Sequence, residues 1–123
     1  MILEAAAGSF DSLPTEEPYP GVRRSSFDSK HATVTRYSFE PGARFPLHRH
    51  PEEQVTLVED GEVELTVGRA SRAMEAGEWS VVGENVVHGL RAGPGGARIL
   101  AIVMPRRERS DPYTVVEDDG HPA

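Results

Sequence analysis

The chain has 123 residues, a formal net charge of −7 and no cysteine. This length suits a single domain with its own core, and the lack of cysteine excludes disulfides, thiolate metal sites and a cysteine nucleophile. The negative charge argues against a nucleic-acid partner, which would need clustered Lys and Arg. No apolar run approaches the roughly 18 residues of a membrane span. We therefore expect a cytoplasmic protein that acts on a small molecule, with no nucleic-acid or membrane partner.

The first 21 residues are predicted to be an irregular lead-in. They start without the basic region of a secretory signal. Three prolines and two glycines interrupt regular structure at short intervals in residues 8–21. This lead-in could lie across its own domain or across a partner subunit, and the sequence leaves both arrangements open.

From Val22 onward, short runs rich in β-branched and aromatic residues alternate with glycine-bearing turns, as is typical of a β-sandwich or β-barrel. No 3.6-residue apolar period persists for three turns, so no long helix is predicted. Asp60-Gly61 predicts a hairpin, because glycine can take a positive φ, and residues 92–96 predict a second turn. The predicted strands are 22–27, 31–39, 44–49, 54–60, 62–67, 71–75, 79–82, 86–91 and 97–104.

Two features are predicted near the C-terminus. Apart from Arg98, residues 97–104 are apolar, which favours a strand buried on both sides, and residues 113–116 could add an edge strand. The barrel would then span residues 22–116. Residues 117–123 carry three acidic side chains and are predicted to be a disordered acidic tail.

Three histidines are candidate metal ligands. If residues 48–50 are extended, a period of two places His48 and His50 on one face and turns Arg49 away. His88 lies in the apolar run 86–90, where an unpaired imidazole would be costly to bury. Such a histidine is more often a hydrogen-bonded core residue, but a second incomplete site in one small domain favours a ligand. His31 and His121 lack such a context.

A divalent ion needs a further ligand, for which the sequence offers Glu52, Glu53 and Gln54. Chemistry favours Glu53, since a carboxylate binds a hard cation better than an amide does. In an extended strand, Gln54 and Glu53 point to opposite faces, and a barrel interior accepts only one of them. The spacing alone leaves the choice open.

The chain resembles the small single-domain cupins of the RmlC-like, cupin-2 barrel type. Their first motif, with His-x-His followed by Glu and Gly, matches residues 42–61, where Gln54 stands in the position of the usual Glu. Their second motif matches residues 77–92 and places its histidine at His88. Here the second motif departs from the family pattern at three positions, Gly83, Asn85 and Ala92.

The resemblance implies an all-β, single-domain jelly-roll barrel, or double-stranded β-helix, of six to eight strands, and a homodimer. It also implies one divalent first-row metal ion (Mn, Ni, Zn or Fe). Within the family, the pattern is similar to the glutamine-ligand cupins of pectin and uronate degradation, which convert an unsaturated uronate into its linear keto form. The ligands transferred by this resemblance are His48, His50, Gln54 and His88.

One departure from that group concerns the proton shuttle. The group is expected to carry Asp, then Phe, then Arg on and after the last barrel strand, and the matching residues here are Ala101, Val103 and Arg107. Without the Asp, another group must move the proton, and Tyr37 and Glu53 are the catalytic candidates. Arg36 and Arg107 are the candidates for binding a substrate carboxylate. Trp79 is expected to pack in the barrel wall.

Three imidazoles and one amide leave the ion its full positive charge and about two open positions. This predicts Lewis-acid chemistry, namely isomerisation, elimination or hydrolysis of a small oxygenated carboxylate or sugar-derived substrate. The alternatives are a non-catalytic cupin that binds a small molecule and an Fe-dependent dioxygenase.

Overall fold

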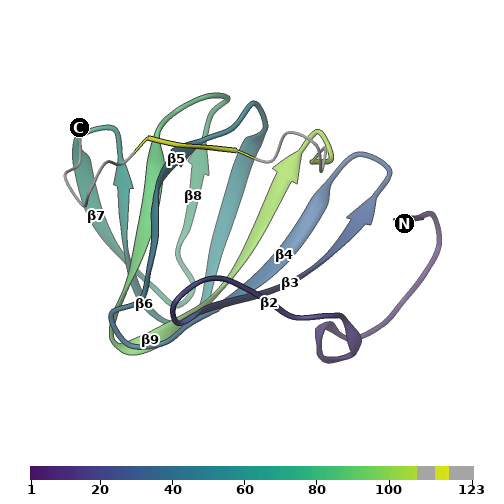
Figure 1. Cartoon of the computed structure of the whole chain (residues 1–123), viewed down its shortest axis with the longest axis horizontal. Coiled ribbons are helices and arrows are strands. Elements are labelled where there is room, and N and C mark those ends of the chain that lie inside the picture. The colour runs from purple at the N-terminus through teal and green to yellow at the C-terminus, as the bar shows by residue number, and fades with distance from the viewer. Residues whose placement is uncertain (108–112, 117–123) are drawn as a thin grey trace.

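A computed structural model describes residues 1–107 and 113–116, and nearly all of its regular elements are strands (Figure 1). They form one ten-stranded sheet that curls into a jelly-roll barrel. The described part of the chain holds no helix that is long and apolar enough to cross a membrane. The elements are β1 (Ile2–Leu3), a 3-10 helix η1 (Phe10–Ser12), β2 (Glu16–Tyr19), β3 (Val22–Ser29), β4 (Thr33–Phe39), β5 (Arg44–Arg49), β6 (Glu53–Val67), β7 (Ala70–Glu75), β8 (Trp79–Val82), β9 (His88–Met104) and β10 (Thr114–Val115).

The long strands β6 and β9 pair along their whole length, and this pairing corrects two of the predicted turns. The antiparallel register runs from Glu53 opposite Met104 to Val67 opposite His88. Asp60-Gly61 and residues 92–96 therefore lie inside strands. The register shifts at both segments, so each forms a β-bulge that bends its strand without reversing it.

Glycine is required at these two bulges because the backbones touch there. Gly61 and Gly96 both have a φ of +75°. A Cβ at Gly61 would collide with the carbonyl oxygen of Gly96, and a Cβ at Gly96 would lie 2.7 Å from that of Phe39. The positive φ predicted at Gly61 is present, but it serves a bend within β6 and not a hairpin.

The two halves of β9 pair with different strands, and this arrangement builds the site. Its first half lies beside β5, with His88 opposite His48. Its second half lies beside β4, with Val103 opposite Thr33. β10 pairs with the other edge of β5, which confirms the predicted edge strand. The predicted acidic tail, 117–123, lies outside the described residues.

The N-terminal lead-in is more regular than the sequence indicates. β1 pairs with β3 in parallel and β2 pairs with it antiparallel, and η1 places Phe10 5.7 Å from the Phe27 ring. The prolines therefore limit the length of these strands without preventing them. The segment packs on its own domain, and contact with a partner subunit stays a prediction.

Side chains alternate between the interior and the outer face of the sheet. Val22, Val63, Met74 and Ile99 are fully buried members of one apolar core. Residues 97–104 follow the same alternation, so this strand is buried on one side only, contrary to the prediction. Trp79 is also not a barrel-wall packing residue, because it lies on the outer face with 63% of its surface exposed.

Candidate metal centre

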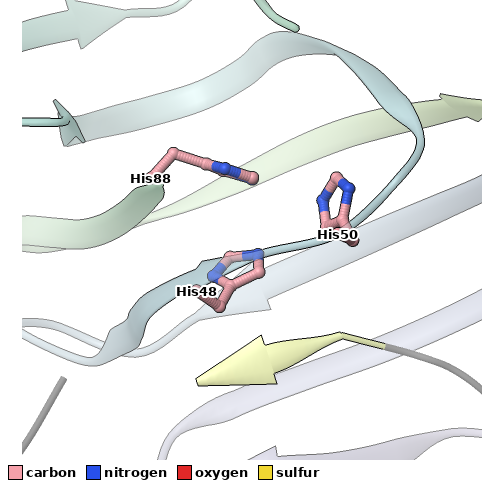
Figure 2. Close-up of side chains that lie close together, drawn as sticks. All are labelled: His48, His50 and His88. Atoms are coloured by element: carbon pink, nitrogen blue, oxygen red, sulfur yellow. The ribbon is translucent and has the colours of Figure 1, made fainter. Parts of the chain in front are cut away.

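Three histidines meet at the junction of β5 and β9. His48 lies near the end of β5, His50 directly follows that strand, and His88 opens β9 opposite His48. The alternation along the chain turns both His48 and His50 inward and leaves Arg49 exposed. The three side chains are almost fully buried, and one nitrogen of each lies within 4.8 Å of the others (Figure 2).

Backbone carbonyls fix the orientation of all three rings. The Nδ1 atoms of His48, His50 and His88 lie 2.8, 3.0 and 2.9 Å from the carbonyl oxygens of Pro46, Glu52 and Val86. Because a carbonyl only accepts, each Nδ1 carries the proton and donates it. Each Nε2 therefore keeps its lone pair, which is the state in which an imidazole binds a metal through that atom.

The environment also keeps the rings neutral. Burial, with a smaller effect of the neighbouring His88, lowers the pKa of His48 to about 3. Burial lowers the pKa of His88 to about 4, and it lowers the pKa of His50 as well. The nearby guanidinium of Arg107 acts in the same direction on all three rings. Around neutral pH the cluster is thus uncharged and ready to accept a cation.

Gln54 directs an oxygen at this cluster. Its Nε2 donates to Thr56 Oγ1 at 2.9 Å, which leaves its Oε1 facing His50 Nε2 at 3.1 Å. In this orientation two lone-pair atoms face each other. His88 Nε2 is buried and has no hydrogen-bond partner among the described residues. A cation bound between these atoms would satisfy all of them, so the donor set fits a divalent first-row ion.

A buried ion pair stands behind His50. Glu52 is 4% exposed, and its Oε1 lies 3.3 Å from His50 Nδ1 and 3.8 Å from Arg107 Nε. From the sequence, Glu52 was a candidate only for a direct metal ligand. In the structure it lies instead beside the Nδ1 atom of His50, where it orients that ring. Glu52 precedes β6 in an irregular segment, so no strand period indicated its burial.

The four residues predicted for catalysis or substrate binding divide into two pairs. Tyr37 and Arg107 both line the small cavity beside the histidines, which also includes Gln54. Both residues are therefore close enough to the histidines for the roles predicted for them, proton transfer by Tyr37 and carboxylate binding by Arg107. Glu53 and Arg36 do not reach it.

The corrections for Glu53 and Arg36 follow from strand alternation. Glu53 is exposed on the outer face of β6, because its neighbour Gln54 takes the inward position. Arg36 is the outward residue of β4, where it pairs with Glu59 at 3.4 Å and lies 4.7 Å over the ring of Phe10. The chain thus uses Arg36 to hold its lead-in segment and not to bind a ligand in the barrel.

Two further sequence expectations concern Ala101 and the remaining histidines. Ala101 is buried and points inward between Thr35 and Thr56, so the acid expected at this position is absent from the interior. His31 is exposed in the turn before β4, away from the cluster. His121 lies outside the described residues.

Comparison with known proteins places this site in a family. The family model described as "Cupin domain" matches residues 35–103. The chain belongs to the cupins. This cupin is 33% identical over 99 residues to a Bacillus subtilis protein named H2HPP isomerase, a match that covers 80% of this chain and 42% of that protein. It thus spans less than half the length of this relative.

Solved cupin structures share the fold of this chain. An RmlC-like cupin from Shewanella frigidimarina has a TM-score of 0.79 at 24% identity, with 88% of this chain and 97% of that chain covered. KdgF from Halomonas sp. has a TM-score of 0.75 at 22% identity, with 85% and 99% covered. Membership in the cupins and the three-histidine cluster together indicate a metal-binding protein.

Proposed function

We propose that this cupin binds one divalent first-row metal ion (Mn, Ni, Zn or Fe) through His48, His50, Gln54 and His88. The observation that carries the proposal is the convergence of three buried, neutral imidazoles whose Nε2 atoms keep their lone pairs. All four donors are uncharged, and the nearest carboxylate, Glu52, lies behind His50. The ion would therefore keep most of its charge for a substrate.

The proposed reaction is isomerisation, elimination or hydrolysis of a small oxygenated carboxylate or sugar-derived substrate. When bound, such an ion supplies Lewis-acid polarisation of a carbonyl or hydroxyl group. Arg107 would hold the substrate carboxylate, since its Nε is buried without a hydrogen-bond partner in the described chain and lies 3.8 Å from Glu52. The hydroxyl of Tyr37, in the same cavity wall, would move the proton. The relative named as an isomerase supports this class of reaction.

A specific observation favours a second candidate, a non-catalytic cupin that binds a small molecule. The interior position that would carry the shuttle acid is Ala101, whose side chain has no proton to exchange. If Tyr37 does not replace this acid, the site would hold its ligand without converting it. The two candidates share the metal site and differ only in proton transfer.

Metal analysis of protein purified from its own host tests the shared site. We expect close to one first-row ion per chain. His50→Ala should remove most of it, whereas Arg49→Ala, which changes the neighbouring outward residue, should retain it. Zinc, nickel or manganese would support Lewis-acid chemistry, and iron would favour the dioxygenase alternative. A well-folded wild type without metal would refute the site.

Proton exchange separates the enzyme from the binder. An isomerase of this type must exchange the proton on the carbon next to a substrate carbonyl, and NMR in D₂O follows that loss directly. We expect exchange with an α-keto or uronic acid in the metal-loaded wild type and a strong reduction in Tyr37→Phe. Binding without exchange would favour the non-catalytic cupin.

We also propose that two copies of this chain form a homodimer through the outer face of β6 and β8. Trp79, Val81 and Leu57 are 63%, 54% and 37% exposed there, and Leu57 is the cross-strand partner of Trp79. Each chain carries a net charge of −7, so two copies repel each other in general. The apolar patch formed by Trp79, Val81 and Leu57 on this face is where two such chains approach at the lowest cost.

A further inference from the structure

A groove of about 430 Å³ lies on the outer face of the sheet, where β5, β9 and β6 run side by side. Leu47 and Gly89, which are both buried, form its floor. Glycine keeps this floor low, because a Cβ at Gly89 would lie only 3.2 Å from the side chain of Leu47. The volume of the groove falls within the usual range for a small-molecule site, roughly 300–1,000 Å³.

The sheet itself separates this groove from the metal centre. Leu47 and Gly89 line the groove, whereas their chain neighbours His48 and His88 belong to the buried cluster on the other face. Successive residues of a strand point to opposite faces, so a ligand in the groove does not reach the histidines. The proposed function therefore leaves the groove without a role.

Positive charge is concentrated around the groove. Among the described residues that line it, three are arginines, Arg44, Arg69 and Arg91, and one is an acid, Glu64. The chain as a whole has the opposite balance, with 13 basic and 20 acidic residues. Arg44 and Arg91 are also direct cross-strand partners on β5 and β9, a placement in which like charges are destabilising. An anion between them would offset this repulsion.

Other arginines of this chain are paired with carboxylates. Arg24 and Arg72, for example, form ion pairs at 3.2 and 3.3 Å. In the part of the chain that the structure describes, the side chains of Arg69 and Arg91 form no hydrogen bond or ion pair. Their guanidinium groups are therefore available to an external oxyanion, which such groups bind through two parallel hydrogen bonds.

The balance of charge favours a doubly charged ligand. Three guanidinium groups and one carboxylate leave a formal charge of +2 around the groove. A single carboxylate would offset half of this charge, whereas a phosphate monoester carries about −1.5 to −2 at pH 7. The hydroxyls of Thr66 and Ser71 also line the groove and are hydrogen bonded to each other at 2.9 Å. Because that bond uses only one of their two protons, the other can be donated to a ligand oxygen.

We propose that this groove binds the phosphate group of a small phosphorylated molecule, with Arg44, Arg69 and Arg91 as its binding residues. The volume beyond the arginines accommodates the organic part of the ligand. Inorganic phosphate offers the same chemistry, and the experiment must therefore distinguish the two sources. The site lies apart from the metal centre, so its occupancy does not depend on the proposed function.

Calorimetric titration of the full-length protein in a phosphate-free buffer at low salt tests the proposal. The probes are glycerol 3-phosphate, inorganic phosphate and glycerol. Glycerol 3-phosphate should bind with a Kd below about 1 mM, and glycerol, which lacks the charged group, should not bind. Inorganic phosphate should bind no more tightly than the ester. Tighter binding of the inorganic ion would overturn the assignment to a phosphorylated molecule.

Matched variants locate the bound phosphate. Arg91→Gln should weaken binding at least about tenfold, since it removes a charged hydrogen-bond donor. Arg98→Gln removes the same charge from an exposed position of β9 outside the groove, and it should change the affinity less than about twofold. Glu64→Gln should strengthen binding several-fold, because it removes the acid from the groove. All three side chains are exposed, so the variants should fold.

The outcomes keep this site distinct from the metal centre. Equal affinities in Arg91→Gln and Arg98→Gln would overturn the proposal. His50→Ala should leave phosphate binding unchanged. Loss of binding in that variant, with Arg91→Gln unaffected, would place the phosphate at the metal and overturn the proposal as well. A wild type that binds metal but no phosphate ester would refute the groove site alone.

Discussion

The interior face of β3 and β4 and the outer face of β6 and β8 reverse the usual order of a half-buried sheet. Such sheets ordinarily point apolar side chains inward and polar ones outward. Here Asp28, Thr33 and Thr35 are buried inside, whereas Trp79 and Val81 are exposed outside. Departures of this kind are expected where a chain binds something. The comparison shows that polar side chains are buried in the interior on β3 and β4, whereas the second half of β9 contributes a conventional apolar core.

The largest expected effect comes from a charge placed in the conventional part of the interior. Ile99→Asp buries a carboxylate at a fully buried apolar position and should lower the free energy of unfolding by about 4 kcal/mol or more. Leu100→Asp, the next residue on the half-buried outer side, should cost about 1 kcal/mol. Urea denaturation measures both. Equal losses would mean that the two faces of β9 do not differ.

Acidification should destabilise the metal-free protein through its histidines. The pKa of His48 is lowered to about 3 and that of His88 to about 4, so between these values and 6.5 the unfolded chain binds more protons than the folded one. The contribution of these two neutral rings to the free energy of unfolding is therefore fully present above pH 6.5 and is lost as the pH falls toward 4. At pH 5 the loss should be about 2 kcal/mol for each ring.

Thermal unfolding from pH 7 to pH 4 measures this loss, and His48→Gln should reduce its slope. A flat profile in the metal-free wild type would contradict the lowered pKa values. The same shifts predict that bound metal leaves only well below pH 6.5, because protons compete weakly for these rings. Release already complete near pH 6.5 would contradict the neutral, buried cluster.

The three histidines of the site could be predicted from the sequence because the signals that mark them are local ones. The His48–His50 period and the apolar setting of His88 both hold in the structure. The continuity of β6 and β9 was missed, since a glycine with positive φ suits a turn and a bulge equally well. The choice between the two is made by pairing between strands far apart in the sequence.

The outward positions of Arg36 and Glu53 and the burial of Glu52 were also missed, for a related reason. Alternation states which residues share a face but not which face is the interior. On β4 the inward residues are Thr33, Thr35 and Tyr37, so the polar row would have been taken for the solvent side. The polar side chains in this buried row thus obscured the pattern by which the interior face of β4 could have been recognised.

A smaller effect is expected from the hydrogen bond that orients Gln54. Thr56→Val removes the acceptor for the Gln54 amide group, which frees that side chain to rotate its oxygen away from His50. Metal affinity should fall roughly tenfold, as for other residues that orient a ligand. Thr66→Val removes a hydroxyl on the same strand that forms an exposed hydrogen bond with Ser71 at 2.9 Å, and it should leave affinity unchanged. Competition with a chromophoric chelator measures both, and equal affinities in the two variants would argue against Gln54 as a ligand.

A substitution on the apolar outer face of β6 and β8 should have the smallest effect on the stability of the fold and a clear effect on dimer formation. Trp79→Ser removes the most exposed part of that face, so the stability of the single barrel should change by no more than about 0.5 kcal/mol. The proposed homodimer, in contrast, should dissociate at concentrations where the wild type remains paired, because central aromatic residues carry much of an interface's energy. Light scattering over a dilution series measures the mass, with Arg69→Ser as an exposed control outside this face. A wild type that stays monomeric at high concentration would refute the homodimer. If the Trp79→Ser variant still forms a dimer as stable as that of the wild type, the interface lies on another face and Trp79 is not part of it.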